Sequence, residues 1–380
     1  LRTIITMKAS GKITRILSID GGGIRGIVPA VILARLEEIL QQLSSNPDAR
    51  LVDFFDFFAG TSTGSMIVAG LLAPNKDNRP SYSAKEIVDL YFESADTIFQ
   101  DSLLQDIKSV AGLLNVKYNP EGIESVFQQH FADTELKDLL KPTLIPAYDL
   151  SRGKNYFFRQ QKAKVSARHN YYLKDVLRSA TSAITYFPPI QISTVDQSRQ
   201  RCFIDGGIFA NNPALSAYAE FHYHNPILHA KDTMMLSLGT GKQGVYLDCE
   251  TTQNWGALEW REPADNLFTN AVSDANHYQL RAVYDNKPNY LRLDAFFKDT
   301  DKSSLDNTSK DYLDCLYCLG QEIVQNNKHA IKSFAQQLIN NSPQPAEKRG
   351  QAQSLLNKDN SIKTGFVNKI TKKIRTALLK

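Results

Sequence analysis

Short apolar runs alternate with longer amphipathic segments along this chain of 380 residues. Ile13–Ile19 and Asp53–Ala59 are brief, rich in β-branched or aromatic residues, and typical of buried strands. Between them, Val28–Leu43 repeats apolar residues at helical spacing. Strands that alternate with helices predict a mostly parallel sheet with both faces covered.

The same two patterns recur over the rest of the chain. We predict further strands at Thr143–Leu150, Asn155–Arg159, Arg201–Ile204, Met234–Leu238 and Tyr290–Leu293. We predict further helices at Met66–Leu72, Ala84–Ile98, Leu173–Ile184, Pro213 to Phe221, and Tyr312–Leu338. Pro74–Ser83 is polar and contains prolines, which predicts a loop.

Composition places the chain among ordinary globular proteins. Hydrophobic residues make up 42% and charged residues 22%, and the length allows one large α/β domain or two smaller ones. No stretch approaches the eighteen or so apolar residues that a membrane-spanning helix needs. Residues 1–12 lack the apolar core and cleavage site of a signal peptide. We therefore expect a cytoplasmic or peripheral membrane location, with secretion left open.

The net charge of +4 is distributed unevenly. Residues 343–380 contain nine basic and two acidic residues, which leaves a net charge of −3 for residues 1–342. In Phe366–Lys380 the apolar and basic residues separate on a helical wheel, which is typical of helices at membrane surfaces. We predict one main domain at 12–340, a linker at 342–360, and a basic amphipathic helix at 361–380. That helix would either contact anionic membranes or dock on the body of the protein.

The sequence Gly60-Thr61-Ser62-Thr63-Gly64 lies between a predicted strand and a predicted helix. This is the layout of a nucleophile elbow, in which a sharp turn presents the serine above the sheet. Gly60 and Gly64 are required because side chains there would collide with the neighbouring strand and helix. At a helix N-terminus, Ser62 would also benefit from N–H groups and a dipole that favour negative charge. We predict that Ser62 is a nucleophile.

Gly21–Gly26 is a second glycine-rich turn, and it admits two interpretations. A dinucleotide site would require the next strand to end in an acidic residue that binds ribose. Here the next strand ends in the serine elbow instead, which favours a loop whose N–H groups stabilise an oxyanion. Arg25 would either orient that loop, meet a substrate phosphate, or be an ordinary solvated surface residue.

The general base is less evident from the residues alone. A Ser–acid–His order is common in α/β hydrolases, but none of the seven histidines lies in a recognisable motif. Asp205 ends an apolar strand and precedes Gly206 and Gly207, as a group at the carboxyl edge of a sheet would. An aspartate before two glycines is also common in plain turns.

Taken together, the motifs resemble those of the patatin-like phospholipase family. Asp20–Gly26 with Pro29 resembles its oxyanion loop, Gly60–Gly64 its nucleophile elbow, and Asp205-Gly206-Gly207 its acidic motif. Asn211-Asn212-Pro213 and the segment from Ala180 to Pro189 also look like family sequence. The similarity covers residues 12–241 and continues more weakly to about 340.

The resemblance implies a three-layer α/β/α fold and a lipid acyl hydrolase with a Ser62–Asp205 dyad and no catalytic histidine. The oxyanion hole would come from Gly22, Gly23 and their neighbours in the motif, which includes Gly21, Arg25 and Gly26. The expected partners are membrane or micellar glycerolipids, with no nucleic acid, metal or cofactor. Rival hypotheses are an α/β-hydrolase esterase with a Ser–Asp–His triad, a storage or lipid-binding relative without activity, and a nucleotide-binding protein. A lid would come from Pro74–Ser83 or Leu103–Tyr118.

Overall fold

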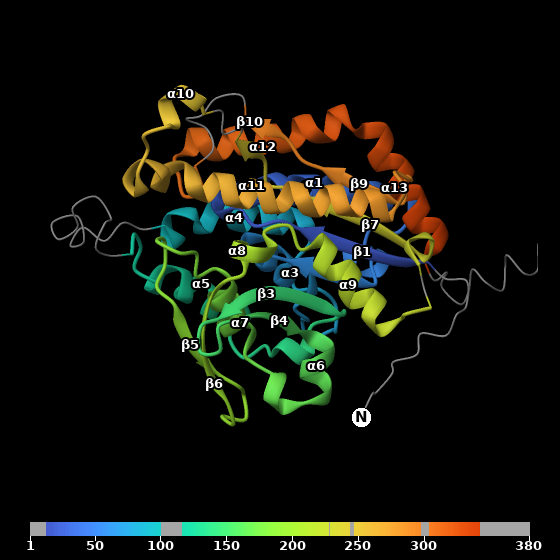
Figure 1. The fold of residues 1–380 in the computed structure, drawn as a ribbon. Coiled ribbons are helices and arrows are strands. Elements are labelled where there is room, and N and C mark those ends of the chain that lie inside the picture. Colours follow the sequence, from blue (N-terminus) through green and yellow to red (C-terminus); the bar gives the residue numbers. More distant parts are fainter. Residues whose placement is uncertain (1–12, 100–115, 228, 244–246, 298–303, 343–380) are drawn as a thin grey trace, which may run out of the picture. The chain divides into compact units, whose positions relative to one another are not determined.

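The structure, a computed structural model, describes residues 13–99, 116–227, 229–243, 247–297 and 304–342 (Figure 1). The chain divides into two compact units, Leu1–Asn340 and Asn341–Lys380. The predicted linker at 342–360 and basic helix at 361–380 lie outside the described residues, except for Ser342. Most of the lid candidate Leu103–Tyr118 does so too.

A central sheet organises the first unit. Among the described residues it contains eight strands, with the order β5-β6-β3-β2-β1-β7-β9 and with β4 paired to β3. The strands are β1 (Thr14–Ile19), β2 (Phe57–Gly60), β3 (Thr143–Asp149), β4 (Lys154–Arg159), β5 (Ile190–Ser193), β6 (Gln200–Asp205), β7 (Thr233–Leu238) and β9 (Tyr290–Leu293). The run β3-β2-β1-β7-β9 is parallel, whereas β4, β5 and β6 pair antiparallel. The predicted mostly parallel sheet is confirmed.

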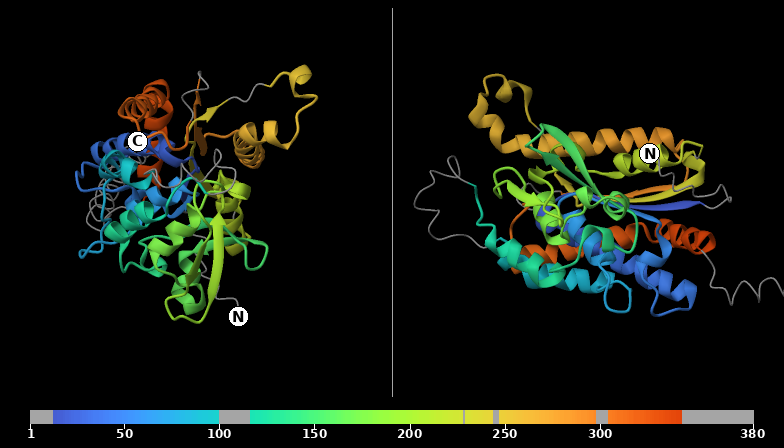
Figure 2. Two further views of the ribbon diagram at one scale, coloured as in Figure 1. Left: turned by 90° about the vertical axis from the view of Figure 1, so that its left-hand side faces the viewer. Right: turned by 90° about the horizontal axis from the view of Figure 1, so that it is seen from below.

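Helices cover both faces of this sheet, as its alternating side chains require. Leu17 and Ile19 of β1 belong to a core that includes residues of α1 (Ile27–Ser44), α4 (Ala84–Ile98), α12 (Lys310–Asn326) and α13 (Lys328–Asn341). Ile16 belongs to the opposite core, with residues of α9 (Ala214–His224) and α11 (Ala257–Val283). Figure 2 shows α11 on one side of the sheet and α1 with α12 on the other. The three-layer α/β/α architecture is thereby confirmed.

Further helices complete the described fold. They are α2 (Leu51–Phe54), α3 (Thr63–Leu72), α5 (Glu121–Phe131), α6 (Gln160–Val165), α7 (Leu173–Ala180), α8 (Gly207–Ala210) and α10 (Cys249–Thr252). Strands β8 (Lys242–Gln243) and β10 (Phe296–Phe297) form a separate parallel pair. No helix in the described part of the chain is both long and apolar enough to cross a membrane.

Three predicted elements differ from the structure. Asp53–Ala59 is not one strand, because Asp53 accepts a hydrogen bond from Arg50 N at 2.9 Å and closes the helical turn α2. The predicted helix Tyr312–Leu338 is two helices that meet at Asn327, whose side-chain amide donates to Ile323 O at 2.8 Å. The helix predicted at Leu173–Ile184 ends at Ala180, and the residues that follow form a loop.

Candidate active site

Ser62 occupies the turn between β2 and α3 in a strained backbone conformation. Its φ of 51° and ψ of −123° are unusual for a residue with a side chain. The turn is held by Thr61, whose N–H donates to Ile19 O at 3.2 Å and whose hydroxyl donates to Ala210 O at 2.6 Å. A side chain at Gly60 would collide with Gly64 O. The geometry is that of a nucleophile elbow.

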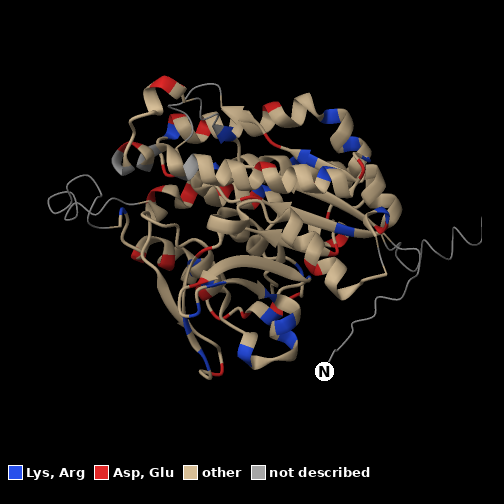
Figure 3. Cartoon of the chain, viewed as in Figure 1, with Lys and Arg blue, Asp and Glu red and all other residues tan. Residues whose placement is uncertain are grey.

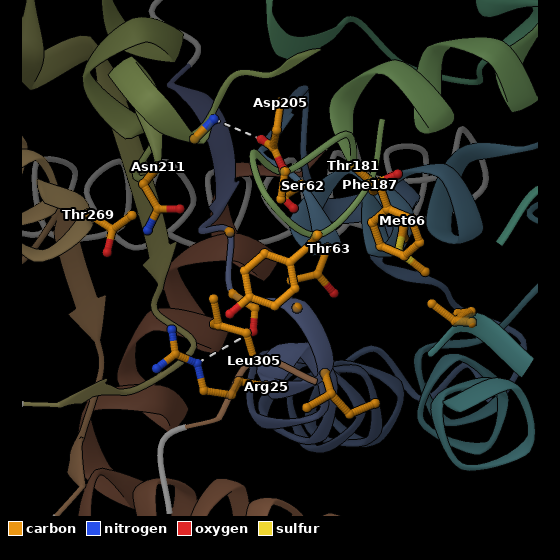
Figure 4. A pocket seen from close by; sticks show the side chains of 18 of the residues that line it. Arg25, Ser62, Thr63, Met66, Thr181, Phe187, Asp205, Asn211, Thr269 and Leu305 are labelled. Atoms are coloured by element: carbon orange, nitrogen blue, oxygen red, sulfur yellow. Dashed lines mark hydrogen bonds between the residues drawn. The ribbon is translucent and has the colours of Figure 1, made fainter. Parts of the chain in front are cut away.

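Asp205 ends β6 with its carboxylate beside Ser62 (Figure 4). The Ser62 hydroxyl faces this carboxylate, and Asp205 Oδ1 accepts the Gly207 N–H at 2.7 Å. Asp205 is only 5% exposed. Burial raises the pKa of Asp205 from 3.8 to about 6, although the nearby Ser62 hydroxyl and the Gly207 N–H oppose the rise. Asp205 is therefore a stronger base than a free aspartate and is still mostly ionised at neutral pH.

The glycine-rich loop lies next to this pair. Gly21 N–H donates to Asn211 O at 3.0 Å, so this N–H group is already used within the protein and is not a donor for a ligand. In contrast, the N–H groups of Gly22 and Gly23 have no acceptor among the described residues, and both glycines line the same cavity as Ser62. The same holds for the N–H of Thr63, the residue after Ser62, a donor that the sequence motifs did not single out. Three unused donors beside a serine are suited to binding an oxyanion.

Gly23 has a φ of 56°, and a Cβ there would collide with Leu305 O, which accepts the Ile24 N–H at 2.8 Å. We predict that Gly23→Ala displaces the loop and lowers kcat by about 100-fold or more. The measurement is kcat for a soluble ester together with the urea midpoint.

Gly153 provides the matched control for this substitution. It has a similar φ of 61°, but a Cβ added there would meet nothing within 4 Å. Gly153→Ala should therefore cost about 1 kcal/mol of stability and leave kcat unchanged. Equal kcat values for the two variants would contradict a role for the Gly23 loop in catalysis.

A buried network of ion pairs holds the start of the glycine-rich loop in place. Arg292 of β9 donates to both carboxylate oxygens of Asp20, at 2.8 and 2.6 Å, and to Asp294 at 2.7 Å. Burial by itself would lower the pKa of Arg292, but the charges of Asp20 and Asp294 raise it above its usual value. Thr240 adds a hydrogen bond to Gly21 O at 2.8 Å. The sequence motifs missed Arg292, which has no local signal; Thr240 was detectable within its Gly-Thr-Gly turn at the end of a strand.

Arg25 is buried rather than solvated. Only 6% of it is exposed, and its guanidinium lies 5.8 Å from the centre of the Phe297 ring. Burial lowers the pKa of Arg25. The interpretation as an ordinary surface arginine is therefore wrong, and Arg25 lies in the lining of the cavity (Figure 4).

The cavity above Ser62 has a volume of about 420 Å³. Its polar end is formed by the glycine-rich loop, Ser62 and Asp205, and the remainder is mainly apolar, with Met66, Ala95, Ile98, Phe99, Ile123 and Phe187. Such a lining suits a hydrocarbon chain whose ester group lies at the polar end. No residue of the lid candidate Pro74–Ser83 is among the described residues that line it.

The histidines lie elsewhere. All seven are in the described part of the chain, and none lines this cavity. His130 is hydrogen-bonded to Tyr82 at 2.8 Å, and His277 to Tyr290 at 2.9 Å. None of the seven histidines therefore places an imidazole in the cavity beside Ser62.

The family model and the relatives that match this chain belong to the same family. The family model described as patatin-like phospholipase matches residues 17–218. Patatin-like protein 4 of Arabidopsis thaliana is 31% identical over 339 residues, which are 83% of this chain and 84% of that protein. Patatin-like protein 2 of Arabidopsis thaliana is 34% identical over 342 residues, with coverages of 83% and 84%. Probable inactive patatin-3-Kuras 1 of Solanum tuberosum is 30% identical over 363 residues, with coverages of 88% and 95%.

Proposed function

The chain belongs to the patatin-like phospholipase family, and from this premise we propose that it is a lipid acyl hydrolase that cleaves fatty acyl esters of glycerolipids through Ser62 and Asp205. The observation that carries the proposal is the buried Asp205 carboxylate, which lies beside Ser62 at the polar end of an apolar cavity. Nucleophile, base and oxyanion donors are the three groups that acyl transfer from an ester requires.

We propose the following steps for the nucleophile, the base and the oxyanion donors. Asp205 accepts the proton of Ser62 as Oγ attacks the ester carbonyl, and the N–H groups of Gly22, Gly23 and Thr63 bind the oxyanion. The intermediate collapses to an acyl-Ser62 ester, and the protonated Asp205 gives its proton to the departing alcohol. Water then attacks the acyl group with Asp205 again as base. This step releases the fatty acid and restores Ser62.

The pH dependence of the reaction should report on Asp205. A protonated carboxyl group accepts no proton from Ser62, so kcat/KM should fall about tenfold per pH unit below about pH 6 and level off above it. The measurement is kcat/KM for a soluble short-chain ester between about pH 4.5 and pH 8.5. A profile that stays level down to about pH 4.5 would contradict Asp205 as a buried base.

The rival hypotheses make different demands on the chain. A Ser–Asp–His triad needs a histidine at the cavity, and the lining contains none among the described residues. A non-catalytic role is a real alternative within this family, because one potato relative is named probable inactive. Labelling with a fluorophosphonate probe distinguishes an active serine hydrolase from a non-catalytic relative. The wild-type chain should be labelled and Ser62→Ala should not. Absence of labelling in the wild type would overturn the proposal.

We also propose, from the sequence, that Phe366–Lys380 contributes peripheral contact with anionic membranes. The basis is its segregation of basic and apolar residues.

A further inference from the structure

Three large apolar side chains lie exposed in the lining of the catalytic cavity. Ile184 is 53% exposed, Ile208 is 44% exposed and Phe268 is 69% exposed. They come from three separate segments: the loop after α7, the short helix α8, and α11. We call these three residues the apolar rim. All three line the cavity that contains Ser62.

The backbone around Ile184 keeps its side chain outside the core. Its neighbour Thr185 is β-branched and has a φ of 72°, a conformation that such residues avoid. The turn is nevertheless fixed, because Ala183 O accepts the N–H groups of Tyr186 and Phe187, each at 3.1 Å. Thr185 O in turn accepts the Lys117 N–H at 2.8 Å. Exposure of Ile184 is thus built into a strained, hydrogen-bonded turn.

Ile208 and Phe268 lie on elements tied to the active site. α8 begins two residues after Asp205, and Ala210 O at its end accepts the Thr61 hydroxyl. α11 packs against α8, and Thr269, the residue after Phe268, lies near Asn211 in the cavity wall (Figure 4). Ile208 and Phe268 of the apolar rim therefore have fixed positions relative to Ser62.

The residues immediately around each member of the apolar rim in the sequence carry no charge, although α11 has Asp265 and Asp274 on either side of this stretch. Charged residues make up 22% of the chain, yet none occurs in residues 179–195, 206–219 or 266–273. In Figure 3 the ribbon of α8 is accordingly tan, whereas α6 carries two basic residues, Lys162 and Lys164. Arg25 and Asp205, the basic and the acidic residue of the cavity lining, are both buried. An exposed apolar surface with few charges beside it matches the acyl region of a lipid layer better than a highly charged partner.

We propose that the apolar rim docks the protein on an uncharged or zwitterionic lipid surface, so that an acyl chain passes from the lipid into the cavity without crossing water. The proposal rests on the proposed function for the identity of the cavity's ligand. Docking through the apolar rim differs from electrostatic attraction through Phe366–Lys380. Binding by apolar insertion should persist at high salt, where charge attraction is screened.

Vesicle binding tests this proposal independently of catalysis. Ile184→Ser, Ile208→Ser and Phe268→Ser are combined in a Ser62→Ala chain, and partitioning onto phosphatidylcholine vesicles is measured in about 0.5 M NaCl. We expect partitioning to fall about tenfold or more in the triple variant. Ile227→Ser with Tyr223→Ser is the matched control, because these residues are 82% and 78% exposed but do not line the cavity. It should bind like the parent chain.

Two outcomes would overturn the proposal: equal binding by the triple variant and its parent, or an equal loss in the control. In the active chain, the ratio of vesicle hydrolysis to soluble-ester hydrolysis should also fall about tenfold in the triple variant, and an unchanged ratio would contradict docking. A wild-type chain that binds vesicles through the apolar rim but releases no fatty acid would refute the proposed function and leave the docking surface supported.

Discussion

Replacing Ser62 by alanine is expected to lower kcat for ester hydrolysis by about 10⁴-fold or more, because the described lining of the cavity contains no other serine and no cysteine. Alanine retains the backbone strain and removes only Oγ, so the fold should be unaffected. The measurement is kcat for a soluble ester, together with thermal unfolding of both chains.

Ser179→Ala is a suitable control for this substitution. Ser179 is a fully buried serine whose hydroxyl donates to Asp175 O within α7, and it does not line the cavity. Its kcat should stay within a few-fold of wild type. Comparable activity in Ser62→Ala and the wild type would mean that the reaction uses a different nucleophile.

Asp205→Asn should have the second largest effect, and it should change activity and stability in opposite directions. Loss of the base lowers kcat/KM by about 10² to 10⁴-fold. The raised pKa, about 6 against 3.8, means that the folded chain holds this proton more tightly than the unfolded chain does. Ionisation of Asp205 therefore costs the fold about 3 kcal/mol, and this cost develops as pH rises from about 4 to about 6.

An asparagine removes that cost. The variant should be more stable than the wild type at about pH 8, by up to about 3 kcal/mol, and the gain should be smaller at about pH 5. Urea unfolding at the two pH values measures both differences. A variant that is destabilised to the same extent at both pH values would contradict the raised pKa.

Asp149 offers a matched contrast on the neighbouring strand β3. It is equally buried, but its carboxylate pairs with Arg201 at 3.0 Å. Asp149→Asn leaves that arginine without a charged partner and should lower stability while sparing kcat. The two substitutions thus separate an aspartate that the reaction requires from one that the fold requires.

The parts of the site that the sequence predicts are those with short-range signals. The elbow around Ser62, the glycine-rich loop and the turn at Asp205 each combine an apolar strand with the glycines that a tight turn requires. Sheet class and most strands follow from the same local patterns. Asp53 shows the limit of such patterns, because the hydrogen bond that it accepts from Arg50 N and its ion pair with Arg79 hold the first two residues of an apparent strand in a helical turn.

The remaining features depend on contacts between distant segments. Arg292 supports the loop through Asp20, which lies 272 positions earlier in the chain, and no local pattern distinguishes this arginine from others. Helix α11 is polar and contains Pro263, so its periodicity does not separate it from a loop. The apolar rim becomes visible only when exposure and cavity lining are known together.

In the proposed reaction Ser62 carries the acyl group while Asp205 alone serves as its base. Mass spectrometry of the chain, quenched during turnover of a phosphatidylcholine or a slow ester substrate, detects this acyl group. We expect one acyl adduct on the peptide that contains Ser62, absent from Ser62→Ala and strongly reduced in Asp205→Asn. An adduct on another residue, or fatty acid release that continues undiminished in Ser62→Ala, would contradict the proposed reaction.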